Sequence, residues 1–468
     1  MRKILIAIIL AALAPAWGTA AELRAGAAKG VITPARVEGR ILTTGYPAEG
    51  VVHDIYARVL VLDDGAKKLV IVTYDLNCLD VATPILRSRV LHELGIDPAY
   101  LLLLATHNHD GPIQIVPGNF DYGRWLADKI FALIEEAIAH EQGPVRLYFG
   151  SGPGDFLRSD PRYPSIYGIR GQPLDVEVQV LKVMMGERVL ALLFNQPTHP
   201  MHGSSRRIGV AHPGYAVEEL EARYPGATAL YADACGGDQF IRDGYVMIAP
   251  LRTVKKVGHK LAETVERIAA GPMTEVTGPI SSRMEVLSLP LAPPISYDAA
   301  KKLARQEKAP LDLGFVPYPH PDRGTNWIRA VLQHYEQGLP FPTRSDQYPC
   351  TDDGFMLPAL PEPREFPCRY EEVIVAKIGP MPLVAMQGEV CAPIGLRIKN
   401  ALRDEMPIMV FAYMGEHNLY LPTRELVVKD AYQSRVIQTQ YASPAGWAPE
   451  VEDEMIAGVV KMIEATLR

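Results

Sequence analysis

The sequence has few cysteines, no excess of positive charge and, after its first residues, no long apolar run. Of its 468 residues, 47 are Lys or Arg and 54 are Asp or Glu, which gives a formal net charge of −7. A protein that binds nucleic acid usually carries a basic stripe, and none is visible here, so we expect no nucleic-acid partner. No stretch after residue 20 approaches the ~20 apolar residues of a transmembrane helix.

The first 20 residues have the order of a secretory signal peptide. Two basic residues precede an apolar stretch, Ile4 to Trp17, which small residues follow. This order predicts export, with cleavage after Ala20 or Ala21. An uncleaved anchor is the alternative, and the shortness of the apolar stretch argues against it. We expect one mature domain, residues 21–468, in the periplasm or secreted, and the sequence leaves its oligomeric state open.

The five cysteines are an odd number, so they cannot all pair within one chain. Cys350 and Cys368 flank a Pro-rich segment, and an oxidising compartment would let them form a disulfide. We expect the other three, Cys78, Cys235 and Cys391, to be buried thiols.

Strand-like and helix-like segments alternate along the chain. Turn signals and apolar runs predict strands in residues 56–62, 68–75, 99–106, 144–152, 175–203, 227–239, 371–390 and 406–414. Apolar periodicity predicts helices over residues 84–94, 122–140, 216–225, 250–270, 393–404 and 450–467. Residues from about 290 to 367 are rich in Pro, Tyr and Asp, which indicates an insertion or cap. The expected fold class is therefore α/β, a layered arrangement around mixed sheets.

Polar residues that can bind a ligand follow four of the expected strands. They are His107 and His109, His199 and His202, Asp238, and Glu389. Sites built from strand ends are where α/β enzymes keep their chemistry.

The strand-like run Leu101–Leu104 leads into His107 and His109. Both rings could face one site only if the chain turns after the strand. Zinc takes nitrogen and oxygen donors in a tetrahedral arrangement, so this pair could supply one or two ligands, shuttle a proton, or cap a loop. The pair does not fit the metallo-β-lactamase pattern His-x-His-x-Asp-His, because Asp110 follows His109 directly.

The other candidates are weaker when taken singly. Pro200 separates His199 from His202, so the two need not face one site. We favour His199 as a metal ligand and His202 as a neighbouring or surface residue. Glu389 could be a ligand, or could only favour the start of the helix that follows it.

Six segments resemble, in the same order, those of the neutral/alkaline non-lysosomal ceramidase family. They are GAAKGVITP, LLATHNHDGP, FLRSDPRYPSIYG with LDVEVQVLKV, FNQPTHPM, MQGEVCAPIGLRIK, and YLPTRE with AYQS. Tyr420 and Tyr432 are 12 residues apart (432 − 420), the interval that the resemblance requires. The resemblance covers essentially the whole mature chain, and its strength lies in the order of the segments.

The resemblance implies a zinc hydrolase with a mixed-sheet catalytic domain of ceramidase type and a Pro-rich insertion. It assigns the Zn²⁺ ligands to His107, His199, Glu389 and Tyr420. It places His109 and Tyr432 beside the substrate carbonyl, and Arg158 against polar groups of the substrate. The roles of His107 and His109 could be exchanged.

The chain departs from the family pattern at several points. Asp238 is kept, but Phe240 stands where the family has a serine, which puts the family's usual substrate in doubt. Asp110 also stands where the family has a serine. The chain stops at Arg468, so we expect no C-terminal immunoglobulin-like domain.

Three functions are compatible with these residues. The leading one is hydrolysis of the amide bond in a small-molecule or lipid-like N-acyl compound by a zinc-bound water. The second keeps the metal but takes a small polar amide, ester or lactone. The third is a non-catalytic periplasmic binding protein, which Phe240 favours and the retention of all four proposed ligands opposes.

Overall fold

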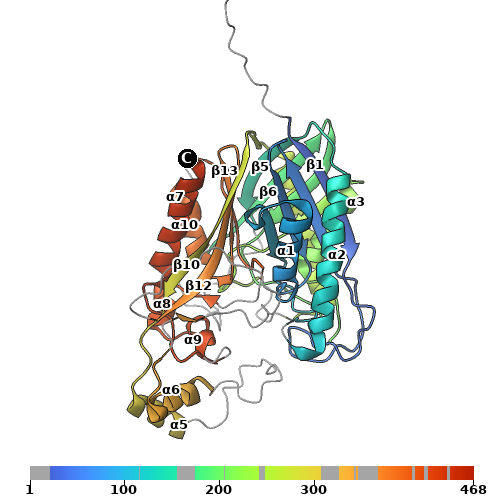
Figure 1. Cartoon of the computed structure of the whole chain (residues 1–468). Helices are drawn as coiled ribbons and strands as arrows, with labels where there is room; N and C mark the ends of the chain where they lie inside the picture. The colour runs from blue at the N-terminus through green and yellow to red at the C-terminus, as the bar shows by residue number, and fades with distance from the viewer. Residues whose placement is uncertain are drawn as a thin grey trace, which may run out of the picture.

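The computed structural model describes residues 22–114, 116–154, 174–204, 206–241, 248–306, 326–341, 344–345, 367–402, 406–415, 420–439 and 443–468. In this part of the chain, the inner faces of three larger sheets pack together in one apolar cluster, and helices cover their outer faces (Figure 1). The expected α/β class with mixed sheets is confirmed.

The first sheet is formed by the N-terminal strands. Its order is β1 (Arg24–Val31), β2 (Tyr56–Asp63), β3 (Lys68–Tyr74) and β4 (Leu101–Ala105). Only the pair β3 and β4 is parallel. Helices α1 (Ala82–Leu94) and α2 (Phe120–Ala139) share a hydrophobic cluster with its outer face.

The second sheet has the order β8-β7-β6-β5-β9. The strands are β5 (Arg146–Pro153), β6 (Glu177–Met185), β7 (Arg188–Asn195), β8 (Thr228–Tyr231) and β9 (Thr274–Val276). Helices α3 (His212–Arg223) and α4 (Leu251–Ala270) pack against its outer face. The parallel pair β7 and β8 sends both of its following loops toward the same region.

The third sheet is C-terminal and has the order β10-β12-β13-β15. Its strands are β10 (Ile280–Pro290), β12 (Cys368–Ile378), β13 (Met381–Met386) and β15 (Met409–Phe411), with β11 (Arg344–Ser345) beside β12. Helices α7 (Ala392–Leu402) and α10 (Val451–Leu467) cover it. Two short parallel strands, β14 (Glu389–Val390) and β16 (Tyr420–Leu421), follow β13 and precede the helices α8 (Arg424–Val428) and α9 (Tyr432–Thr439).

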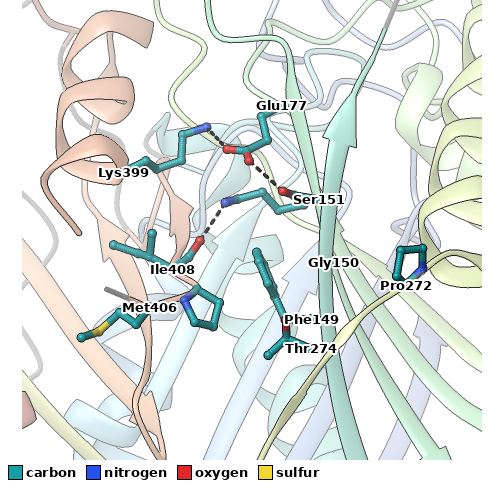
Figure 2. A pocket seen from close by; sticks show the side chains of 11 residues that line it. Phe149, Gly150, Ser151, Glu177, Pro272, Thr274, Lys399, Met406 and Ile408 are labelled. Atoms are coloured by element: carbon teal, nitrogen blue, oxygen red, sulfur yellow. Dashed lines mark hydrogen bonds and ion pairs between the residues drawn. The ribbon is translucent and has the colours of Figure 1, made fainter. Parts of the chain in front are cut away.

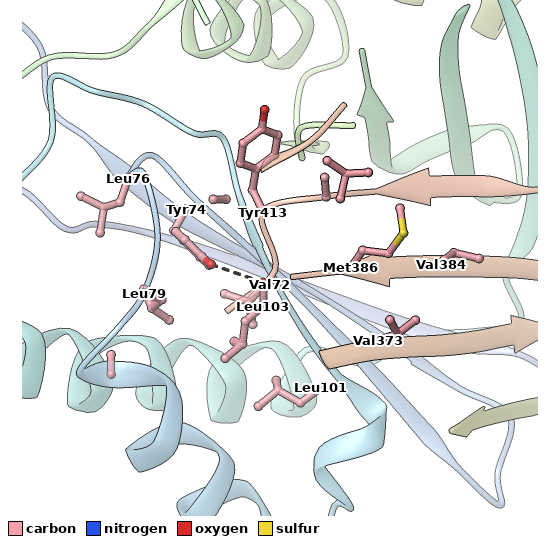
Figure 3. Packing of buried hydrophobic residues seen from close by; sticks show 14 of the residues in the cluster. Val72, Tyr74, Leu76, Leu79, Leu101, Leu103, Val373, Val384, Met386 and Tyr413 are labelled. Carbon is pink, nitrogen blue, oxygen red and sulfur yellow. Dashed lines mark hydrogen bonds between the residues drawn. The ribbon is translucent and has the colours of Figure 1, made fainter. Parts of the chain in front are cut away.

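The apolar run in β4 is buried on both faces. Leu102 and Leu104 join the cluster formed by the inner faces of all three sheets. Leu101 and Leu103 point the other way, into the cluster that α1 and α2 share, near Val373 of the third sheet (Figure 3). Because successive side chains of a strand alternate between faces, a strand between two apolar layers reads as a continuous apolar run.

One long strand escaped sequence analysis. β10 has the sequence ISSRMEVLSLP, whose polar residues hide its strand character. It is held by antiparallel pairing along its whole length with β12, from Ile280 opposite Ile378 to Pro290 opposite Cys368. A partner about ninety residues away supplies this stability, which local propensity does not reveal.

The expected insertion is described only in part. Helices α5 (Tyr297–Gln306) and α6 (Asn326–Gln337) pack on each other around Ala300, Ile328 and Val331. Most other residues between 307 and 366 lie outside the described residues, as do the proposed signal peptide and Cys350. Cys368 is a buried free thiol, so its predicted pairing with Cys350 finds no support. Among the described helices, none combines the length and apolar character needed to cross a bilayer.

A buried ion pair joins α1 to β12. The Arg87 guanidinium donates to both carboxylate oxygens of Glu372, at 2.9 and 2.6 Å. The two side chains are 1% and 2% exposed. Such a pair adds little to the free energy of unfolding. Removing one partner, however, leaves the other as an uncompensated buried charge and lowers that free energy strongly.

We expect Arg87→Met to lower the free energy of unfolding by about 3–5 kcal/mol, because Glu372 would become an uncompensated buried charge. Urea denaturation followed by circular dichroism measures the change. The double variant Arg87→Met/Glu372→Met should recover most of the loss. A double variant less stable than Arg87→Met would contradict this account.

Candidate metal centre

Three buried histidines meet where strands of different sheets end. The rings of His107, His109 and His199 place one nitrogen each within 4.8 Å of the others. The Nε2 atoms of His107 and His109 are 3.2 Å apart. The grouping of His107 and His109 that the sequence left conditional is therefore present.

A left-handed backbone turn at His107 makes this grouping possible. β4 ends at Ala105, and His107 has a φ of 54°. Asn108 secures the turn, since its amide nitrogen donates to the carbonyls of Asp75 at 3.0 Å and Gly209 at 2.8 Å. Tyr413 also has a positive φ, 55°, and its ring centroid lies 4.1 Å from that of His107. Strained non-glycine residues of this kind concentrate at functional sites.

The protonation of His199 follows from its partners. Its Nδ1 lies 2.7 Å from the carbonyl oxygen of Gly236. A carbonyl can only accept a hydrogen bond, so Nδ1 carries a proton and Nε2 is the nitrogen that is turned toward the cluster. This Nε2 lies 3.1 Å from Oε2 of Glu389 and 3.2 Å from the hydroxyl of Tyr420.

Glu389 completes the cluster with a carboxylate. Its Oε2 is 3.1 Å from Nε2 of His199 and 3.3 Å from Nε2 of His107. Burial raises the pKa of Glu389, but the charge and hydrogen bonds of His107 and His199 outweigh burial and bring the pKa well below its usual value. The carboxylate is therefore ionised and faces Nε2 of His199, so a proton or a metal ion can join the two atoms.

These donors fit a metal ion. An imidazole nitrogen and an ionised carboxylate oxygen 3.1 Å apart are held together by a cation between them, which is either a proton on the ring or a metal ion. Tetrahedral zinc ligands with bond lengths near 2.0–2.1 Å are about 3.3 Å apart. The side-chain amide nitrogen of Asn77 lies 3.0 Å from Nδ1 of His107 and orients the ring.

The two tyrosines arrive through β16 and α9. Tyr420 is the Cα partner of Glu389 in the parallel pair β14 and β16. Burial raises the pKa of the Tyr420 phenol well above its usual value, so it keeps its proton at neutral pH. The ring of Tyr432 lies 5.5 Å from that of Tyr420. Burial also lowers the pKa of His109 well below its usual value, with His107 adding to the effect, so the His109 ring is neutral.

Gly236 and Gly237 let the loops that carry His199 and Glu389 approach each other closely. The sequence analysis did not single out these two glycines. A Cβ added to Gly236 would lie 2.6 Å from the backbone nitrogen of Thr198, next to His199. One added to Gly237 would lie 2.4 Å from the carbonyl oxygen of Glu389. The Gly-Gly pair after β8 was the available signal, since glycine marks close backbone approach.

The remaining predicted residues take different places. Asp238 accepts a hydrogen bond from the backbone nitrogen of Ala392 at 2.7 Å, so it holds the start of α7 and the Glu389 segment. Phe240 stacks on His199, with ring centroids 4.9 Å apart. His202 is buried, bonded to Asp110 and 5.7 Å from His109 between ring centroids, so of its two predicted places the one beside the site is confirmed and the one on the surface is wrong. Arg158 lies outside the described residues.

A cavity of about 360 Å³ lies elsewhere, beside β5 and the start of β15 (Figure 2). Its lining includes an ion pair, in which Lys399 donates to Glu177 at 2.9 Å, and Lys399 also contacts Asp175 at 2.5 Å. The backbone nitrogen of Asp175 donates to Oε1 of Gln239 at 3.0 Å, and the backbone carbonyl of Gln239 accepts from the backbone nitrogen of His199 at 2.9 Å. The buried ion pair therefore supports the loop of the metal centre from behind.

We expect Gly237→Ala to weaken metal binding by at least about tenfold, because the added Cβ would displace the Glu389 backbone and with it a ligand. Competition with a chromogenic chelator measures the affinity. Gly118→Ala is the matched control, since a Cβ there meets nothing within 4 Å. Equal affinities in the two variants would show that Gly237 does not position the Glu389 ligand.

Comparisons with known proteins give a structural likeness only. No family model and no curated protein matches the sequence. The structure matches that of neutral ceramidase from Pseudomonas aeruginosa with a TM-score of 0.66 at 19% identity, covering 95% of this chain and 74% of the other. A ceramidase complexed with C2 matches with a TM-score of 0.67 at 18% identity, covering 95% and 75%. This chain therefore has the fold of the ceramidase structures.

Proposed function

We propose that this chain is an exported, zinc-dependent hydrolase that cleaves the amide bond of an N-acyl compound. One observation carries the proposal: Nε2 of His199 lies 3.1 Å from the ionised Glu389 carboxylate, inside a buried cluster of further nitrogen and oxygen donors. The fold shared with ceramidase structures supports the choice of reaction class.

His107, His199, Glu389 and Tyr420 would hold the ion. Two imidazoles, one carboxylate and one phenol form a nitrogen and oxygen donor set of low net charge, which suits zinc. When bound, zinc acts as a Lewis acid and brings the pKa of a water ligand to about 7.

The other side chains would act on the substrate carbonyl. A neutral His109 can donate an N–H to the oxygen on which negative charge develops, and the Tyr432 hydroxyl can donate beside it. Fixed donors need no reorientation during the reaction, and removal of one typically costs about 10²–10³ in turnover. Burial of the cluster strengthens each of these contacts, because the local dielectric constant is low.

The residues that surround the cluster indicate which kind of substrate the site could bind. Phe240 is partly exposed and lies flat against His199, which offers an apolar surface where an acyl chain can pack. The Asp110 and His202 pair is polar, and this observation favours the second candidate, a hydrolase of a small polar amide, ester or lactone. We favour the N-acyl compound, because such a molecule presents both an apolar and a polar half.

The test combines metal content with turnover. We expect about one zinc per chain in the purified wild type and loss of both metal and activity in His199→Ala, because that variant removes a ligand. Activity is measured on fluorogenic N-acyl amides of increasing chain length, and metal by mass spectrometry. His92→Ala, a change at an exposed histidine of α1, is the control.

The outcomes separate the candidate functions. Turnover that rises with chain length supports the N-acyl hydrolase, and turnover restricted to the shortest amides supports the second candidate. No metal after zinc reconstitution, together with no turnover of any amide, would refute both and favour a binding protein.

A further inference from the structure

Gln239 is a buried residue in the turn that follows β8. Its backbone carbonyl accepts from the backbone nitrogen of His199 at 2.9 Å and from the hydroxyl of Thr198 at 3.1 Å. Its backbone nitrogen donates at 3.1 Å to the carbonyl of Gly236, and that same carbonyl lies 2.7 Å from Nδ1 of His199. The place of Gln239 and the orientation of the His199 ring are therefore linked.

The side-chain amide of Gln239 reaches a third residue of the same segment. Its nitrogen donates to the carbonyl of Pro197 at 2.6 Å and to the carbonyl of Asp175. Its oxygen accepts from the backbone nitrogen of Asp175 at 3.0 Å. Both protons and the oxygen of the amide thus have backbone partners. An amide with three fixed partners has a single orientation, so it joins Pro197 to Asp175 as a rigid link.

Asp175 is a firm support for this link. Its carboxylate contacts Nζ of Lys399 at 2.5 Å and accepts from the backbone nitrogen of Glu177 at 3.1 Å. Asp175 and Lys399 are 2% and 4% exposed, so water screens the attraction between their charges only weakly. The segment that carries His199 is thereby anchored, through Gln239, to an ion pair between α7 and the residues before β6.

We propose that Gln239 is a positioning residue that sets the metal affinity of the centre by holding residues 197–199 in place. The inference rests on the proposed function, because it requires His199 to bind a metal ion. His199 lies between Pro197 and Pro200, and proline has no backbone N–H to donate, so the segment has few backbone hydrogen bonds of its own. Gln239 supplies one hydrogen bond to each of its three residues.

Gln239→Met separates the amide from the backbone contacts. Methionine has a similar length, but its thioether cannot donate, while the backbone bond to His199 stays. Gln179→Met is the matched control, since Gln179 is also 2% exposed and its amide nitrogen donates to the carbonyl of Ile408 at 2.7 Å. We expect Kd for Zn²⁺, measured by competition with a chromogenic chelator, to rise about tenfold or more in Gln239→Met and to stay within about twofold of wild type in Gln179→Met.

The coordination geometry is a second readout, which a loss of stability alone would not change. With Co²⁺ in place of zinc, the visible absorption spectrum reports that geometry. We expect the bands to change in Gln239→Met and to match wild type in Gln179→Met. Unchanged affinity and spectrum in Gln239→Met, or equal changes in both variants, would overturn the inference. If Gln239→Met does not fold, Gln239→Asn replaces it, because its shorter side chain cannot join Pro197 to Asp175.

A third readout needs no metal. Hydrogen exchange at the backbone amide of His199 reports how often the segment opens, because that N–H donates to Gln239. We expect faster exchange in metal-free Gln239→Met than in metal-free wild type, and no change in Gln179→Met. If the wild type binds no metal, the proposed function fails, and this exchange still decides whether Gln239 holds the segment. An unchanged rate in Gln239→Met would refute that role.

Discussion

The contact between Nε2 of His199 and Oε2 of Glu389 is the constraint on which the site depends. Without a proton or a metal ion between them, two acceptors held 3.1 Å apart repel each other, and the fold must then supply the force that keeps them together. The Gly236-Gly237 turn lets their backbones approach, and the side chain of Asp238 fixes the segment that follows Glu389. A cation of suitable size relieves the repulsion, so metal binding and local stability are linked.

The same region is where the sheets join. The backbone nitrogen of Asp233 donates to the carbonyl of Ala105 at 3.0 Å, and that of Ala412 donates to Asp233 at 3.1 Å. The ends of strands β4, β8 and β15 are thereby tied together, although they belong to three different sheets. Donors carried on such a rigid junction keep their geometry, which a metal centre and a fixed hydrogen-bond donor both require.

Much of the secondary structure could be read from local patterns, because its elements bury apolar residues with a clear period. The long helices α2, α4 and α10 and the hairpin β2–β3 are confirmed. β10 was missed because its stability comes from pairing with a distant strand. The short helices α8 and α9 lack enough residues for a periodic signal.

By itself, the sequence determined which side chains were available as ligands: histidines after apolar strands, a glutamate after a Gly, and two tyrosines at a set spacing. Only the tertiary structure decided how they combine. It turned His107 toward His109 through a left-handed φ, set the proton of His199 through the carbonyl of Gly236, and made His202 a partner of Asp110. Backbone dihedrals and ring protonation depend on hydrogen-bond partners far away in the chain, and the order of residues alone does not record those distances.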